Sequence, residues 1–202
     1  MGATIERVVT AGVFSLDGED FDVENNVWLV GDEFEVLVID AGHNAKPILK
    51  AIGGRDVLGI VLTHGHNDHL NAAGDLWDGT RALIYLHPAD RMLWDVVYPD
   101  VHPDRDIADG DTFTVAGTTL RVIATPGHSP GSVCLYAEDL GTVFTGDTLF
   151  HGGPGATGRS FSDHPTILAS ITEKLLTLPR DTIVKTGHGE DSTIGAEAAN
   201  LT

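Results

Sequence analysis

The chain has 202 residues, of which 30 are acidic and 12 basic, so its formal net charge is −18. This length suits one domain with a sizeable core, and the few scattered basic residues argue against a nucleic-acid partner. No apolar run approaches the roughly 20 residues of a membrane span, and the opening MGATIERVVTAG has neither part of a secretion signal. We therefore expect a single cytoplasmic domain over residues 1–202, with no membrane partner.

Nine short apolar or alternating runs, each bounded by turn residues, predict β-strands. In chain order they are IERVVTAGVFS, ENNVWLVGD, FEVLVIDAG, VLGIVLTHG, ALIYLHP, DTFTVAGTTLRVIATPG, SVCLYAED, GTVFTGD and DTIVKTGHG. Helical spacing predicts helices in NAKPILKAIGG, NDHLNAAGDLWDG and, most clearly, HPTILASITEKLLTLP (164–179). Hairpin-like strand pairs combined with strand–helix alternation favour two mixed sheets packed face to face and covered by helices.

One connection, residues 87–106, is long and carries Trp94 and Tyr98. Two interpretations remain open at this point. The segment is either a lid or pocket wall whose two aromatic side chains touch a substrate, or a surface helix that buries them against the core.

The segment LTHGHNDHLNAAG packs three histidines and an aspartate into six positions after an apolar run. His64 and His66 alternate on one extended turn and can reach one metal ion. Asp68 and His69 lie further round, toward the following helix, and can reach a second ion. This half of a site needs further ligands from elsewhere in the chain.

Three later residues can complete such a site: His128 in TPGHSPGS, Asp147 in TGDTLF and His188 in TGHGE. Each follows an apolar strand and stands beside a glycine. Ligands at the ends of several strands converge on one edge of a sheet, and an aspartate can bridge two ions with its two oxygens. We therefore expect a two-ion site in which Asp147 is shared.

The remaining histidines suit other roles. Those followed by Pro or Gly in loops or at a helix start are expected at the surface or in caps: His87, His102, His151 and His164. His43, in DAGHNA, follows a strand and is a possible substrate contact. The lone cysteine, Cys134, lies in the alternating segment SVCLYA and is expected to be a buried structural thiol.

In their order along the chain, the H-x-H-x-D-H at 64–69, TPGHSPGS, TGDTLF and the late GHG resemble the metallo-β-lactamase-fold hydrolases, specifically their glyoxalase II-like branch. The resemblance runs from about Val8 to Ile194. It implies an α+β fold, an αββα sandwich of two mixed sheets flanked by helices, with a dinuclear site at one edge. It also assigns the ligands: His64, His66 and His128 for the first ion, Asp68, His69 and His188 for the second, and Asp147 as the bridge.

The resemblance further implies a hydrolase in which a metal-bridging hydroxide attacks the thioester of a small thiol, with Asp68 as a ligand and proton relay. Free thiols have pKa values near 8.5, so the thiolate leaves without a general acid. Zinc is the favoured metal, with iron and manganese as alternatives, because His/Asp sites bind several divalent ions. The alternative functions are a mononuclear iron persulfide dioxygenase and a non-catalytic metal-bound binding module.

Zinc β-lactamases usually carry a secretion signal, and two of their subclasses have cysteine where Asp147 stands; neither feature is expected of this chain. Two departures from the glyoxalase II-like branch bear on the substrate. Glyoxalase II proper adds a C-terminal helical domain that binds glutathione, whereas this chain ends 14 residues after His188. The branch often has a G-R-x-D-F element, of which PGATGRSFSDHP keeps Gly158, Arg159 and Phe161 but displaces the aspartate. Arg159 is expected either to pair with a substrate carboxylate or to form a structural ion pair.

Overall fold

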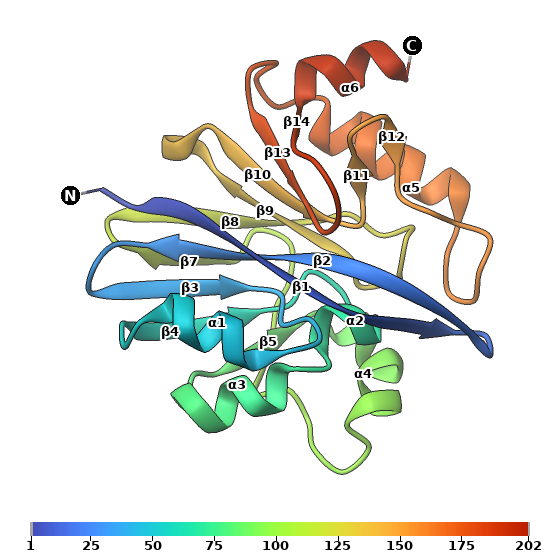
Figure 1. Ribbon diagram of the computed structural model, residues 1–202. Coiled ribbons are helices and arrows are strands. Elements are labelled where there is room, and N and C mark those ends of the chain that lie inside the picture. The colour runs from blue at the N-terminus through green and yellow to red at the C-terminus, as the bar shows by residue number, and fades with distance from the viewer. Residues whose placement is uncertain (1, 202) are drawn as a thin grey trace.

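The computed structural model describes residues 2–201, and two six-stranded sheets lie face to face at its centre (Figure 1). The first sheet has the order β1 (Thr4–Leu16), β2 (Glu19–Gly31), β3 (Glu35–Ile39), β4 (Asp56–Val61), β5 (Ile84–Leu86) and β6 (Arg105–Asp106). The second has the order β14 (Ser192–Thr193), β13 (Ile183–Thr186), β10 (Thr142–Gly146), β9 (Val133–Ala137), β8 (Thr118–Ala124) and β7 (Thr112–Val115). A small hairpin joins β11 (Leu149–Phe150) to β12 (Gly153–Pro154).

Helices cover the outer faces of both sheets, as Figure 1 shows. Beside the first sheet lie α1 (Ala45–Ile52), α2 (Asn67–Leu70), α3 (Ala73–Thr80) and α4 (Arg91–Val97). Beside the second lie α5 (His164–Ser170), a π-helical segment (Ile171–Leu175) and α6 (Ile194–Asn200), and 3₁₀ turns span Pro88–Asp90 and Glu138–Leu140. The predicted sandwich of two mixed sheets between helices is thus confirmed.

Strand β3 shows why the central strands have continuous apolar runs in the sequence. Leu37 and Ile39 face the second sheet, while Val36 and Val38 pack among the residues that contact the helices. Because both faces of this strand are covered, every side chain from Val36 to Ile39 is buried. The apolar contacts on the two faces stack the sheets and the helices around one another.

Polar contacts close the sandwich at one edge. The Asn26 side-chain amide donates to the carbonyls of Thr186 and Gly189 at 3.1 and 3.0 Å, and the Asn26 backbone N–H donates to Gly187. Trp28 Nε1 also donates to the Thr186 carbonyl, at 3.0 Å. These bonds fasten the turn after β13 to strand β2 of the other sheet.

The hairpin of β1 and β2 is longer than the sequence patterns predict. Each strand has 13 residues, and the paired strands reach beyond the sheet toward the loop before α5 (Figure 1). The Asn67 side chain holds the hairpin by donating to the Val13 carbonyl and accepting from the Ser15 N–H. At the tip, the Ser160 N–H donates to Asp17. The hairpin therefore forms a wall that is fixed at two points.

The long predicted helix 164–179 differs in its second half. It begins at α5 but widens into the π-helical segment after Ser170, with Ile167, Ile171 and Leu175 buried against the second sheet. The wider turn changes the spacing of the residues that follow while keeping these three side chains in the core.

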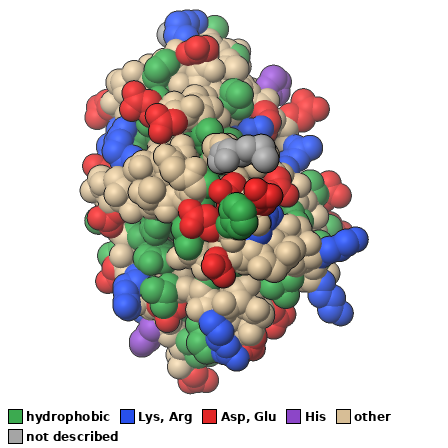
Figure 2. Space-filling view, turned by 90° about the vertical axis from the view of Figure 1, so that its left-hand side faces the viewer, with side chains coloured by type: hydrophobic (Ala, Val, Ile, Leu, Met, Phe, Trp, Pro, Cys, Tyr) green, Lys and Arg blue, Asp and Glu red, His purple; other side chains and the backbone are tan. Residues whose placement is uncertain are grey.

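The surface agrees with the acidic composition. On the face shown in Figure 2, basic side chains stand apart from one another among acidic ones and form no continuous patch. Among residues 2–201, no helix is both long and apolar enough to cross a membrane.

Replacing Asn26 by alanine tests the polar closure of the sandwich. The change removes the two side-chain hydrogen bonds to the Thr186 and Gly189 carbonyls, so we expect the free energy of unfolding to fall by about 1–3 kcal/mol. Urea denaturation of the wild type and of Asn26→Ala measures this difference. A loss below about 0.5 kcal/mol, the range of neutral surface changes, would contradict the role given to this side chain.

Candidate functional site

The seven His and Asp residues predicted from the sequence come together at one edge of the sandwich, where several strands end. His64 and His66 follow β4, His128 follows β8, Asp147 follows β10 and His188 follows β13. Because β10 and β13 run parallel, their carboxyl ends meet at the same edge. The remaining two residues, Asp68 and His69, come from α2. We call these seven residues the His/Asp cluster.

Three histidines form the first group of the cluster. His64 Nε2 and His66 Nδ1 are 3.0 Å apart, and His66 Nδ1 and His128 Nε2 are also 3.0 Å apart. All three side chains are buried. Their facing nitrogens lie within 4.8 Å of one another, a spacing that one metal ion can span.

Asp68, His69 and His188 form the second group. His69 Nε2 lies 3.1 Å from His188 Nε2, and Asp68 Oδ2 lies 3.5 and 3.3 Å from these two nitrogens. Here too one ligand atom from each residue lies within 4.8 Å of the others. A further set joins the two groups, because ligand atoms of His64, His69 and Asp147 also lie within 4.8 Å of one another.

The Asp147 carboxylate reaches both groups. Its Oδ2 lies 3.6 Å from His128 Nε2 in the first group and 3.4 Å from His188 Nε2 in the second. Its Oδ1 lies 3.2 Å from His69 Nε2 without the alignment of a hydrogen bond. This position suits a carboxylate that bridges two cations.

Hydrogen bonds on the outer side of the rings orient four of the histidines. Their Nδ1 atoms face oxygen acceptors at 2.7–3.1 Å, as follows: His64 to Thr63 Oγ1, His69 to Asp40 Oδ2, His128 to the Ala156 carbonyl and His188 to the Glu24 carbonyl. A proton held on Nδ1 leaves the Nε2 lone pair free, directed into the cluster. This is the support that metal-binding imidazoles have in proteins.

Sequence reasoning did not single out Asp40, which supports the cluster from the end of β3. Its carboxylate accepts from the Thr63 N–H at 2.8 Å, from Thr63 Oγ1 at 2.9 Å and from His69 Nδ1 at 2.9 Å. Asp40 is buried, with a φ of 65°. An acidic residue directly after the apolar run VLVI was the signal available for it in the sequence.

Burial and neighbouring charges shift the pKa values of the histidines of the cluster in opposite directions. Burial, with the neighbouring His128, lowers the pKa of His66 to about 3. Burial also lowers the pKa of His188, but the Asp147 carboxylate outweighs it and raises that pKa to about 10. Burial raises the pKa of Asp147, whereas His69 and His188 hold it well below its usual value. His66 therefore favours its neutral form, as metal binding requires.

The donor set fits divalent cations of the zinc, iron or manganese type. It consists of imidazole nitrogens and carboxylate oxygens, the usual ligands of these ions. Asp68 Oδ1 and Asp147 Oδ1 are buried without a hydrogen-bond partner. Such orphaned carboxylate oxygens are costly unless a cation or water meets them.

A groove of about 370 Å³ opens onto the cluster. Its walls include Phe14 and Val23 from the β1–β2 hairpin and Ala156 from the loop before α5. The Phe14 ring packs edge-on against His66, with ring centroids 5.2 Å apart. The wall beside the first group is therefore apolar.

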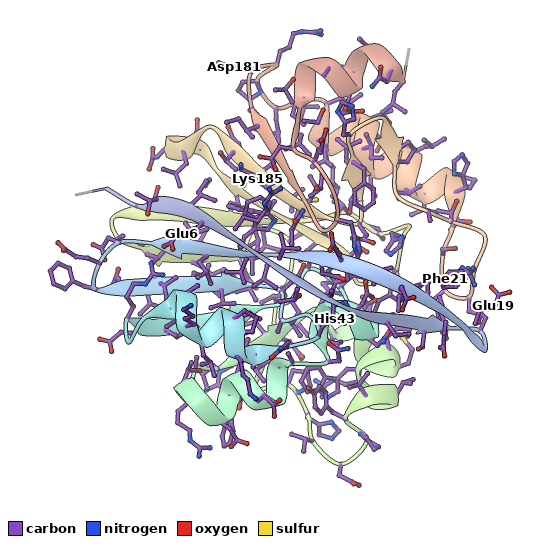
Figure 3. The ribbon with its side chains drawn as sticks, in the orientation of Figure 1. Glu6, Glu19, Phe21, His43, Asp181 and Lys185 are labelled. Atoms are coloured by element: carbon purple, nitrogen blue, oxygen red, sulfur yellow. The ribbon has the colours of Figure 1, made fainter. Side chains whose placement is uncertain are left out.

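Two of the expected substrate contacts lie near the cluster, but both are bonded to other residues of the chain. Arg159 lines the pocket next to Phe14, yet its guanidinium pairs with Glu19 at 2.8 Å and stacks on Phe21; Figure 3 labels both partners at the hairpin tip. The half-buried His43 lies outside the groove lining, and its Nε2 bonds to Asn25 Oδ1 at 2.8 Å.

The other two expected contacts, Trp94 and Tyr98, require a correction. Trp94 on α4 is 1% exposed and packs in the core beside the first sheet, with Nε1 bonded to the Val101 carbonyl. Tyr98 follows α4 and bonds to the Leu70 and Asn71 carbonyls. Neither lines the groove, because the chain buries these rings under the helices, as the second interpretation of this segment expected.

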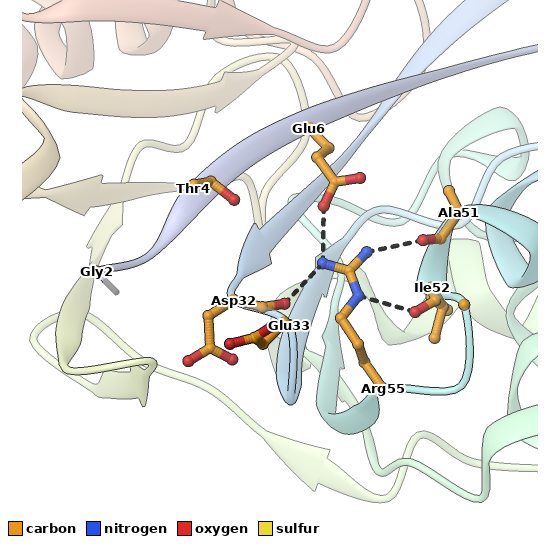
Figure 4. A pocket seen from close by; sticks show the side chains of 9 residues that line it. Gly2, Thr4, Glu6, Asp32, Glu33, Ala51, Ile52 and Arg55 are labelled. Carbon is orange, nitrogen blue, oxygen red and sulfur yellow. Dashed lines mark hydrogen bonds and ion pairs between the residues drawn. The ribbon is translucent and has the colours of Figure 1, made fainter.

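A cavity of about 460 Å³ lies around Arg55, away from the cluster (Figure 4). The Arg55 guanidinium donates to Glu6 and to the carbonyls of Asp32, Ala51 and Ile52. Its donors are thus used by the protein itself, and this cavity adds nothing to the chemistry of the cluster.

Comparisons with known proteins agree with this geometry. Residues 21–188 match the family model of the metallo-beta-lactamase superfamily. The chain is 34% identical to the probable metallo-hydrolase YqgX of Bacillus subtilis, over 86% of this chain and 88% of that protein. It is 33% identical to the hydroxyacylglutathione hydrolase GloC of Haemophilus influenzae, over 82% and 85% of the two chains.

Solved structures with the same fold are also similar to this chain. The BLEG-1 B3 metallo-beta-lactamase superposes with a TM-score of 0.80 at 30% identity, covering 94% of this chain and 97% of that one. TTHA1623 in a di-iron-bound form gives 0.78 at 32%, covering 88% and 94%. ETHE1 from Myxococcus xanthus gives 0.77 at 25%, covering 95% and 83%.

The pKa values of His66 and His188 predict how pH acts on the metal-free protein. An imidazole whose pKa falls on folding, as for His66, stabilises the fold above about pH 6.5, and this contribution is lost as pH falls toward 3. An imidazole whose pKa rises to about 10, as for His188, stabilises below about pH 6.5 and loses its contribution as pH rises toward 10. We therefore expect the highest melting temperature of chelator-treated protein near pH 6.5.

Thermal melting of the chelator-treated protein between pH 5 and pH 10 checks this profile. A melting temperature that stays level or rises from pH 7 to pH 10 would show that His188 is not held in its charged form by the carboxylates.

Proposed function

Because this chain belongs to the metallo-beta-lactamase superfamily, we propose that it is a dinuclear metal-dependent hydrolase that cleaves thioesters of a small thiol. The observation that carries the proposal is the placing of Asp147 between two complete ligand triads. The first triad, His64, His66 and His128, would hold one ion, and Asp68, His69 and His188 would hold the second. Zinc is the metal we propose first, with iron and manganese as alternatives.

Two bound divalent ions would supply an activated water and a Lewis acid for the carbonyl oxygen of the substrate. The residues of the chain have three tasks around that chemistry. The outer hydrogen bonds keep the ligand rings in place, so little reorganisation is needed during reaction. Asp68, whose Oδ1 is buried and unpartnered, would take up a proton. The apolar groove wall, with Phe14 as its largest side chain, would position the substrate beside the first triad.

A thioester suits this site because the departing thiolate needs no proton. Outside the His/Asp cluster, the described groove-lining residues include one titratable side chain, the carboxylate of Glu24. Within residues 2–201, the groove lining therefore offers no lysine, tyrosine or cysteine that could protonate a leaving group. A thiol with a pKa near 8.5 leaves as the anion, whereas an alcohol or amine needs a general acid. Support also comes from the relative named hydroxyacylglutathione hydrolase. The lone, buried Cys134 suits the reducing cytoplasm, which we propose as the location.

A second function deserves a direct test because TTHA1623, a structural neighbour, was solved in a di-iron-bound form. In the persulfide dioxygenase alternative, one iron would be held by two histidines and an aspartate of the same cluster. The two functions differ in metal count and in oxygen consumption, so a single set of assays separates them.

Replacing Asp147 by alanine tests the proposed hydrolase. Removing the shared carboxylate should lower the metal content from about two ions per chain and reduce thioester hydrolysis at least about 100-fold. S-lactoyl and S-formyl esters of several small thiols, glutathione included, serve as substrates. Glu197→Gln, a change at a buried carboxylate on α6 outside the cluster, is the matched control and should keep both properties.

Three results would contradict the hydrolase. One is absence of thioester cleavage by metal-loaded wild type. Another is equal activity of Asp147→Ala and wild type. The third is about one iron per chain with oxygen uptake on a persulfide, which would favour the dioxygenase instead.

Replacing Phe14 by alanine tests the groove wall. Loss of this apolar surface should raise KM and lower kcat/KM about tenfold for substrates with bulky acyl groups, with a smaller effect on acetyl esters. Phe34→Ala is the control, because that ring is 71% exposed and lies outside the groove. Equal effects of the two changes, or no dependence on acyl size, would remove Phe14 from the substrate site.

A further inference from the structure

One buried carboxylate near the cluster has no part in the proposed reaction. Asp90 lies in the long connection between β5 and β6, at the end of the 3₁₀ turn Pro88–Asp90 and directly before α4. Its side chain is fully buried. A carboxylate is costly to bury unless several donors meet it, so its partners indicate what it does.

Three donors from two separate loops meet the Asp90 carboxylate. Oδ2 accepts from the Gly65 N–H at 2.8 Å and from Ser129 Oγ at 2.6 Å, and Oδ1 accepts from the Gly131 N–H at 2.6 Å. Burial raises the pKa of this carboxyl, and the bonds from Ser129, Gly131 and Gly65 act against that rise. The carboxylate is therefore held by both loops at once.

These two loops carry the whole first group of the cluster. Gly65 stands between His64 and His66, and Ser129 directly follows His128. A backbone bond from the Val133 N–H to the Thr63 carbonyl, at 2.8 Å, also joins the two segments, and Asp90 adds a second link beside the histidines. Asp90 is thus a bridge between the backbones that set the spacing of those rings.

Both loops have glycine where they touch this carboxylate. A Cβ atom built on Gly65 would lie 2.9 Å from Asp90 Cβ and 2.8 Å from Leu93 Cβ, and one on Gly131 would lie 2.8 Å from Asp90 Cγ. Side chains at either position would force the loops apart. The close approach of both loops to Asp90 therefore depends on these two glycines.

We propose that Asp90 is a positioning residue for the first group, holding His64, His66 and His128 at the spacing that one metal ion needs. The second group has other supports: Asp40 accepts from His69 Nδ1, and the Asn25 amide donates to Asp68 at 3.0 Å. The inference rests on the proposed two-ion site. It predicts that a change at Asp90 weakens one metal position and spares the other.

Asp90→Asn keeps the shape of the side chain but replaces one of its two acceptor oxygens by an N–H₂ donor. If the amide oxygen faces Gly131, the amide N–H₂ meets the Gly65 N–H; if it is turned round, it meets the Gly131 N–H. Backbone N–H groups cannot reverse their role as donors. In either orientation one loop is pushed away from Asp90.

The zinc affinities of the two metal positions can be measured separately when one group is disabled. Zinc is titrated into the chelator-treated protein, and calorimetry measures its binding. His188→Ala leaves the first group intact, and His128→Ala leaves the second. In the His188→Ala protein, Asp90→Asn should weaken zinc binding by about 10- to 100-fold. In the His128→Ala protein, the same change should alter it by less than about threefold.

Glu197→Gln in the His188→Ala protein is the control for loss of a buried carboxylate, and it should leave zinc affinity unchanged. Equal losses at both positions, or no loss at either, would overturn the role of Asp90. If Asp90→Asn does not fold, Ser129→Ala serves as the second variant, because it removes one donor to the same carboxylate. Weaker zinc binding confined to the first group would support the role of Asp90. Unchanged zinc binding would overturn it. Absence of zinc binding in both single-group proteins would instead count against the two-ion site itself.

Discussion

The structure depends on bringing several imidazole nitrogens within about 3 Å of one another in a buried place. Ring nitrogens of His64, His66 and His128 face one another, and lone pairs directed at one another repel unless a cation lies between them. A free chain would not hold such an arrangement. The two sheets hold it because His64, His66 and His128 each follow the end of a strand whose position is set by core packing.

Two kinds of contact hold the imidazoles of the cluster in this arrangement. Carboxylates and carbonyls outside the rings fix the orientation of the imidazoles, with Asp40 as the clearest case. Other contacts fix the backbone: Asn26 ties the turn before His188 to β2, and Asp90 ties the loops of the first group together. The same edge is then walled by the β1–β2 hairpin, which Asn67 anchors from α2. The hairpin wall and the first group of the cluster are thus both anchored to the segment that follows β4, through Asn67 and Gly65.

The sequence was informative where chemistry and pattern coincide. The H-x-H-x-D-H segment and the three later strand-end residues predict which residues meet, because strand ends in a sandwich converge on one edge. Trp94 was harder to place, since an aromatic residue in a long connection suits a lid and a core equally, and only three-dimensional packing decides. Arg159 was also ambiguous, because its partner Glu19 lies 140 residues away in the sequence. Asp90 could not be found from spacing, as its partners are backbone groups of two distant loops.

The central claim is that the cluster holds two ions that share Asp147. Crystals of protein purified without added metal, measured with X-rays above and below the absorption edge of the metal found in them, test this most directly. The account predicts two anomalous-difference peaks, one within each triad, both in contact with the Asp147 carboxylate. A single peak, or two peaks of which only one touches Asp147, would contradict it.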